Sequence, residues 1–258
     1  MEIDILKHNR EAWNQQVRTG NIWTKPVDSW QIAAAKNGEW SIFLTPTKPV
    51  PREWFPELEG KEVLCLASGG GQQGPILAAT GAKVTVFDNS PAQLAQDEMV
   101  AKRDGLTIAI EQGDMRNLSR FKDECFDLIF HPVANCFIDD VCSVWKECYR
   151  ILKKGGILLA GFCNPLIYIF DSEEWDINHR LAVRYSIPYS DAEHLPKEQL
   201  KARIEANEPL EFGHSLADLI GGQMAAGLLM NGFYEDSAGG GLLDPYINTF
   251  IATRAMKG

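Results

Sequence analysis

Residues 61–74 read KEVLCLASGGGQQG and residues 82–90 read AKVTVFDNS, and these two stretches decide the fold. Val63 to Leu66 form a continuous apolar run, which is typical of a parallel strand buried on both faces. Gly69 to Gly71 follow closely, where glycine lets the backbone turn sharply and lets a ligand approach the main chain. We therefore expect free amide N–H groups in this turn, followed by a helix with Pro75 in its first turn.

A second strand over residues 83–87 delivers Asp88 at its tip, about 20 residues beyond the first glycine. A carboxylate in this place suits the two ribose hydroxyls of an adenosine. The glycines also match G-x-G-x-x-G literally at Gly69, Gly71 and Gly74, so the stretch alone is compatible with NAD or with S-adenosylmethionine. A turn that merely joins strand to helix is the structural alternative, and the acid that follows favours half of a nucleotide-binding crevice.

The composition predicts a soluble globular protein with one main core, since 45% of its 258 residues are apolar. The N-terminus lacks a signal-peptide core and no apolar run approaches a membrane span, so we expect a cytoplasmic protein with no membrane contact. The six cysteines include no C-x-x-C pair, which favours reduced, buried thiols and no metal site. A net charge of −10 opposes binding to nucleic acid. The oligomeric state is left open.

Residues 1–60 precede the first core strand and hold five of the seven tryptophans. Short helices are predicted over Asn9 to Val17 and Asp28 to Lys36. We interpret residues 1–60 as an N-terminal arm or lid over the crevice, whose rings exclude water and can face a sulfonium cation. The alternative is an arm that tryptophans pin to the outside of the core.

Strands and helices alternate up to residue 162, which predicts a parallel, doubly wound sheet with right-handed crossovers. Residues 163–213 break this alternation and are predicted to be an insertion after the fifth strand, a cap on the substrate side. A capping box at Ser215 and Asp218 predicts a helix that reaches Met230. Two final strands are predicted over residues 232–235 and 246–254.

Three further polar side chains are candidates for the site. Asp114 follows the third strand, where its carboxylate can accept from an exocyclic amine while the next backbone N–H donates to a ring nitrogen; together these groups would recognise adenine. His131 and His214 are the weak candidates for a general base, should the acceptor need one. Each is matched by a structural alternative, a capping aspartate or a hydrogen-bonded histidine.

With these residues in place, the chain resembles the class I S-adenosylmethionine-dependent methyltransferases, in particular the small-molecule type of methyltransferase domain. Four segments carry the resemblance in the order of the family's motifs: residues 63–71 (VLCLASGGG), 86–90 (VFDNS), 113–115 (GDM) and 149–156 (YRILKKGG). The resemblance implies a Rossmann-like, seven-stranded α/β sheet, mostly parallel with an antiparallel terminal strand. It also implies that residues 61–258 form the methyltransferase domain and that S-adenosyl-L-methionine is the cofactor.

The resemblance also implies roles for single residues. Ala67, Ser68, Gly69 and Gly71 would hold the methionine part, and Asp88 the ribose, with Asn89 packing beside it. Asp114 and Met115 would contact adenine, and His131 would lie beneath the methionine part. Many members carry an acid where Cys65 stands and a glycine where Ala67 stands, so another group must recognise the amino group: a backbone carbonyl, Gln72, Gln73 or the arm.

A sulfonium is an activated leaving group, so methyl transfer needs in-line placement of the acceptor and exclusion of water more than a dedicated acid or base. The first prediction is therefore a methyltransferase that acts on a small-molecule acceptor. An NAD-dependent oxidoreductase is disfavoured because no Tyr-x-x-x-Lys pattern is present and residues 113–115 fit the first pattern. A non-catalytic sensor that binds S-adenosylmethionine is the third alternative.

Overall fold

The computed structural model describes residues 3–258, apart from the side chains at positions 172 and 176. Its described residues form one seven-stranded sheet and a separate two-stranded one. The strands of the large sheet are β1 Glu62–Leu66, β2 Lys83–Asp88, β3 Ile108–Gln112, β4 Phe126–His131, β5 Leu152–Cys163, β8 Leu228–Asp236 and β9 Phe250–Lys257. Their order in space is β3-β2-β1-β4-β5-β9-β8. β9 runs antiparallel to both neighbours, whereas β1 to β5 are all paired in parallel, as predicted.

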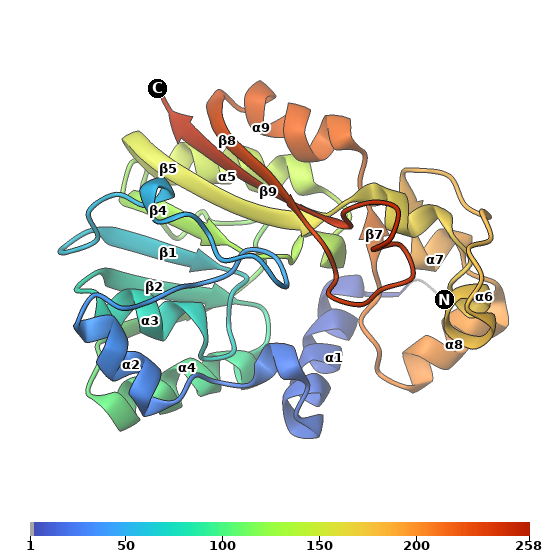
Figure 1. The fold of residues 1–258 in the computed structure, drawn as a ribbon, viewed down its shortest axis with the longest axis horizontal. Coiled ribbons are helices and arrows are strands. Elements are labelled where there is room, and N and C mark those ends of the chain that lie inside the picture. Colours follow the sequence, from blue (N-terminus) through green and yellow to red (C-terminus); the bar gives the residue numbers. More distant parts are fainter. Residues whose placement is uncertain (1–2) are drawn as a thin grey trace.

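The central strand β1 shows why helices cover both faces of the sheet. Val63 and Cys65 face one apolar cluster and Leu64 and Leu66 face the other, and all four are fully buried. Figure 1 shows α2, α3 and α4 below the sheet and α5 and α9 above it. These helices are α2 Ser29–Lys36, α3 Gln73–Ala79, α4 Pro91–Asp104, α5 Val141–Ile151 and α9 Gly222–Ala225.

Local sequence signals place the helix that follows β2. The Ser90 hydroxyl accepts from the backbone N–H of Gln93 (3.2 Å), so Ser90 caps α4. Pro91 starts the helix and Gly105 ends it in the left-handed conformation (φ 65°). The start of α4 therefore lies directly beside the end of β2.

The N-terminal residues divide into two parts. The first part is α1 Ile5–Thr19 followed by a short 3-10 turn, Ile22–Thr24, and it lies beyond the carboxyl ends of β1 and β2 (Figure 1). The second part, from α2 onward and with a further 3-10 turn over Arg52–Trp54, packs on the sheet, with Ile32 and Leu44 about 1% exposed. Both predicted helices are present.

The predicted helix from Ser215 to Met230 is wrong in its second half. Ser215 does cap a helical turn, which is a π-helix over Ala217–Gly221, but α9 ends at Ala225. Gly227 then takes a positive φ of 101°, which reverses the chain, and Met230 lies in β8. The helix stops because Leu228, which is 2% exposed, enters the sheet opposite β9.

Residues 163–213 form a lobe beside α1 at the right of Figure 1. It contains a 3-10 helix, Pro165–Ile169, and α6 Ser172–Asn178, β6 Tyr189–Ser190, α7 Asp191–His194, α8 Lys197–Glu205 and β7 Phe212–Gly213. β6 and β7 pair with each other and not with the large sheet. Among residues 3–258 no helix combines the length and the apolar character needed to cross a membrane.

Candidate functional site

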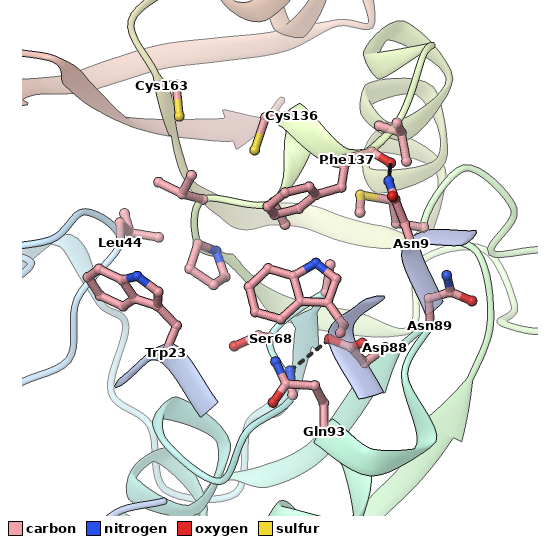
Figure 2. Close-up of a pocket in the computed structure, with 18 of the residues that line it drawn as sticks. Asn9, Trp23, Leu44, Ser68, Asp88, Asn89, Gln93, Cys136, Phe137 and Cys163 are labelled. Atoms are coloured by element: carbon pink, nitrogen blue, oxygen red, sulfur yellow. Dashed lines mark hydrogen bonds between the residues drawn. The ribbon is translucent and has the colours of Figure 1, made fainter. Parts of the chain in front are cut away.

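A cavity of about 390 Å³ lies at the carboxyl ends of the central strands. Its walls come from the turns after β1, β2, β3 and β4, from α1 and from the lobe of residues 163–213. Figure 2 shows Ser68 and Asp88 on one side of this cavity and Cys136 and Cys163 on the other. Seven of the nine predicted cofactor residues line it: Ala67, Ser68, Gly69, Asp88, Asn89, Asp114 and Met115. Gly71 and His131 do not.

The glycine turn is held by two carboxylates. The Gly69 N–H donates to Asp88 Oδ2 (3.0 Å), and the N–H groups of Gly70 and Gly71 both donate to Asp97 Oδ2 (2.9 and 3.1 Å). The expectation that these amides stay free is therefore wrong. Glycine is needed at position 69 for close approach, since a Cβ there would lie 2.8 Å from the Gln93 Cβ.

Asp97 is the residue of this site to which the sequence patterns did not point. It lies on the buried face of α4 and is fully buried, and its other oxygen, Oδ1, has no partner among the described residues. Burial raises the pKa of Asp97 to about 7, against the two hydrogen bonds from the turn. An acid three residues after Leu94 and four before Ala101 was the available signal, because that spacing places it on the core face.

Replacing Asp97 with asparagine is expected to change how stability depends on pH. Because the pKa of Asp97 is raised in the folded state, its protonated carboxyl group stabilises the fold at low pH. This contribution to the free energy of unfolding is lost as pH rises from about 4 to 7. Between pH 5 and pH 8 the wild type should therefore lose about 2 to 4 kcal/mol of unfolding free energy relative to Asp97→Asn, measured by urea denaturation. Glu98→Gln, an exposed change on the same helix, should keep the wild-type dependence. Parallel curves for the wild type and Asp97→Asn would contradict this role.

Asp88 sits at the end of β2 with its carboxylate toward the cavity (Figure 2). Its Oδ1 accepts from the Ser90 N–H (2.9 Å) and its Oδ2 from Gly69, which fixes the side chain and leaves a lone pair on each oxygen. Burial raises the pKa of Asp88, and the backbone N–H donors oppose that rise. The arrangement is able to accept two hydroxyl groups from the cavity.

Asn89 lines the cavity and bonds through its side chain to the arm. Its amide donates to the Leu6 carbonyl (2.9 Å) and accepts from Arg10 Nε (3.0 Å). Asn14 makes a second link, since its Oδ1 accepts from the Ser90 hydroxyl (2.8 Å). The loop after β2 is thus bonded to α1.

Asp114 is paired with Arg116, which the sequence patterns did not single out. The Arg116 side chain donates to both oxygens of Asp114, at 2.7 to 3.1 Å, so the carboxylate is oriented before any ligand binds. The preceding Gly113 packs on Phe87, where a Cβ would lie 2.5 Å from the ring. Met115 is 9% exposed and belongs to the apolar cluster above the sheet.

The two predicted histidines are turned away from the cavity. His131 is fully buried, with Nδ1 2.8 Å from the Leu66 carbonyl and Nε2 2.6 Å from the Asn135 side chain. Burial lowers the pKa of His131, which favours the neutral ring. His214 Nε2 lies 2.9 Å from the Asn135 carbonyl. The structure contradicts cofactor contact and proton transfer by His131, because its ring does not line the cavity. Both histidine rings instead contact Asn135 and hold its loop in place.

The five tryptophans of residues 1–60 lie in different surroundings. Trp13 and Trp23 line the cavity, and Trp13 meets Phe137 edge to face with ring centroids 5.1 Å apart. Trp40 and Trp54 pack elsewhere, on Phe55 and Tyr234. Trp30 is 70% exposed.

A buried asparagine on α1 joins the core to the lobe. The Asn9 amide donates to the carbonyls of Phe137 and Leu210 (3.0 Å each), and its oxygen accepts from the Leu210 N–H (2.8 Å). Figure 2 shows the bond to Phe137 at the edge of the cavity. No sequence signal separated Asn9 from a solvated helix residue, because its partners lie more than a hundred residues away.

The glycine end of the cavity fits S-adenosylmethionine. Gly69 provides a surface without a side chain, and Gln93 Oε1 is a buried acceptor that has no partner among the described residues. Cys65 is fully buried and does not line the cavity, so it cannot take the place of the family's acid. Gln72 and Gln73 do line it, with the Gln72 amide donating to the carbonyls of Ile22 and Lys25.

Comparisons with known proteins agree with this geometry. Residues 64–160 match the family model described as "Methyltransferase domain". The chain is 56% identical over 253 residues to the "Uncharacterized methyltransferase YbaJ" of Bacillus subtilis, covering 98% of each chain. It is 29% identical over 127 residues to a "Ubiquinone biosynthesis O-methyltransferase" of Pseudomonas savastanoi, across 47% of this chain and 55% of that one.

Among solved structures, an S-adenosylmethionine-dependent methyltransferase from Mesorhizobium loti matches with a TM-score of 0.62 and 18% identity, over 80% of this chain and 95% of that one. The fold, the four ordered motifs and the full-length relative agree. The chain belongs to the class I S-adenosylmethionine-dependent methyltransferases.

Proposed function

We propose that this methyltransferase transfers the methyl group to a small-molecule acceptor held inside the cavity. The observation that carries the proposal is the wall of the cavity, which α1 and the lobe of residues 163–213 complete over the strand ends. A net charge of −10 and the lack of lysine and arginine among the described lining residues oppose a nucleic acid acceptor. A relative named for ubiquinone biosynthesis supports a small acceptor.

We assign the glycine end of the cavity to the cofactor. Ala67, Ser68 and Gly69 would hold the methionine part, with Gly71 supporting the turn from behind. Asp88 would accept the ribose hydroxyls, Asn89 would pack the loop against α1, and Asp114 and Met115 would hold adenine. When bound, S-adenosylmethionine supplies a methyl group on a sulfonium sulfur, poised for in-line displacement.

The residues of the protein then position the acceptor and exclude water from the reacting end. Trp13, Trp23 and Phe137 provide apolar walls that exclude water from the reacting end. Aromatic faces also favour a cation, and they line the same cavity as the carboxylate of Asp88. No histidine lines the described cavity, so we propose that positioning supplies the rate enhancement without a histidine base.

The proposal is tested by following a labelled methyl group. Purified protein is incubated with methyl-labelled S-adenosylmethionine and an extract of Bacillus subtilis divided into small-molecule and macromolecular fractions. We expect label in a compound of the small-molecule fraction, and much less transfer by Asp88→Ala at a cofactor concentration that is near saturation for the wild type. Label that appears only in protein or nucleic acid would contradict a small acceptor. Binding without transfer to either fraction would favour the sensor.

A further inference from the structure

The cavity contains a carboxyl group that the cofactor assignment leaves unused. Its described lining residues include three acids, Asp88, Asp114 and Glu211, and no lysine, arginine or histidine. Asp88 is at the ribose position and Asp114 is paired with Arg116. Glu211 lies instead just before β7, in the lobe that has no part in the shared motifs.

Glu211 is held rigidly from behind. Its backbone N–H donates to Asp191 Oδ2 (2.8 Å), its carbonyl accepts from the Asp191 N–H (3.0 Å), and its Oε2 accepts from the Tyr168 hydroxyl (2.9 Å). The neighbouring cation, Arg203, is bonded to Asp191 at 3.3 Å. Within residues 3–258, Glu211 has no ion pair and its Oε1 has no hydrogen-bond partner.

Glu211 Oε1 is open to the cavity. This Oε1 is the oxygen that Tyr168 leaves unpaired, and Glu211 lines the main cavity as well as a smaller one of about 190 Å³, which Arg203 lines too. Tyr168, which bonds Glu211, packs with Cys136 and Cys163. These cysteines stand across the cavity from Asp88 in Figure 2, so Glu211 belongs to the end away from the ribose site.

A partly buried carboxylate with one unpaired oxygen and no ion pair is stabilised when a ligand supplies the missing partner. An acceptor with a carboxylate or phosphate would meet the Glu211 carboxyl and no cation among the described lining residues. A protonated amine would pair with Glu211, and it would also lie near the rings of Trp13, Phe137 and Phe250, which line the same cavity.

We propose, resting on the function proposed above, that the acceptor is a small molecule with an apolar body and a protonated amino group, and that Glu211 binds this ammonium. An ammonium nitrogen has no lone pair with which to displace the methyl group, so it anchors the acceptor and another atom receives the methyl. Glu211 is thus the residue that selects for charge. The apolar body would lie against Phe137, Ile167 and Phe250. Asp88 and Glu211, at opposite ends, divide the cavity between cofactor and acceptor.

Matched probes test this assignment by ligand-detected NMR on protein saturated with S-adenosylhomocysteine. The probes are benzylamine, phenethylamine, cyclohexylamine and tryptamine, each compared with the carboxylate that has the same apolar body. We expect saturable binding of at least one amine and tighter binding of that amine than of its carboxylate. Glu211→Gln should weaken the amine by about tenfold or more while S-adenosylhomocysteine affinity is kept.

The pH dependence of amine affinity separates two possible roles of Glu211, which are binding the ammonium group and supporting the fold. Burial, and then Asp191, raise the pKa of Glu211, so amine affinity should fall as pH is lowered towards 5 in the wild type and stay flat in Glu211→Gln. The other ionisable groups that face it are Tyr168, Arg203 and Cys136. Glu208→Gln, an exposed change three residues earlier, should behave as the wild type.

The outcomes are distinguishable. Failure of the wild type to bind S-adenosylhomocysteine would contradict the proposed function, whatever the amines do. Normal binding of S-adenosylhomocysteine with no amine bound, with carboxylates preferred, or with amine affinity unchanged in Glu211→Gln would overturn the amine assignment alone.

Discussion

Replacing Asp88 with alanine is expected to weaken S-adenosylhomocysteine binding by roughly 1.5 to 3 kcal/mol, or about 10- to 150-fold. This range applies to the loss of hydrogen bonds to a charged group. The same carboxylate holds the Gly69 and Ser90 amides, so the alanine variant also releases the glycine turn, to which we assign the methionine part. Isothermal titration calorimetry measures the change directly.

Asp88→Asn separates these two contributions. Asparagine keeps one acceptor and nearly the same volume, but it loses the charge and puts a donor amide beside one of the two backbone N–H groups. We expect an affinity between those of the wild type and Asp88→Ala. The control is Asp123→Asn, an exposed acid far from the cavity lining, which should bind as the wild type does. Unchanged affinity in Asp88→Ala would remove Asp88 from the cofactor site.

Removing residues 1–20, and with them α1, is expected to lower S-adenosylhomocysteine affinity by about tenfold or more. The truncation deletes the Trp13 wall and the bonds from Arg10 and Asn14 to the loop that carries Asp88. Each buried polar group left without a partner costs about 1 to 3 kcal/mol, so stability in urea should also fall. A truncated protein with normal affinity would contradict a lid role for α1.

Asn9→Ala tests the link between α1 and the lobe of residues 163–213 without removing the helix. It keeps the helix and the tryptophan but breaks the three hydrogen bonds that join Phe137 to Leu210 through α1. We expect amide exchange in the lobe of residues 163–213 to quicken while the sheet keeps its protection. A deletion to residue 45 is unsuitable, because it also removes Ile32 and Leu44 from the core.

The parts of the fold that the sequence predicted are those governed by local chemistry. The apolar run of β1 and Pro75 in the first turn of α3 act within a few residues of themselves, and local patterns of the same kind predict the alternation of strands and helices up to residue 162. The position of Asp88 in the cavity wall could also be predicted, because Asp88 ends a strand beside the glycine turn.

What the sequence did not predict depends on distant partners. His131 was misplaced because the groups that engage its ring, Leu66 and Asn135, are set by the pairing of β4 with β1. The helix after Ser215 was drawn too long because the entry of Leu228 into the sheet depends on β9. Asp97 is buried beside the glycine turn through tertiary packing, and the place of Glu211 in the cavity wall also depends on tertiary structure, which no local pattern states.

The most direct test of the account is a crystal structure of the protein with S-adenosylhomocysteine. We expect both ribose hydroxyls on the Asp88 carboxylate, the amino-acid part against Ala67 to Gly69, adenine beside Asp114 and Met115, and open space between the sulfur and Glu211. A complex in which Asp88 contacts no part of the ligand, or in which the adenosine lies outside this cavity, would contradict it.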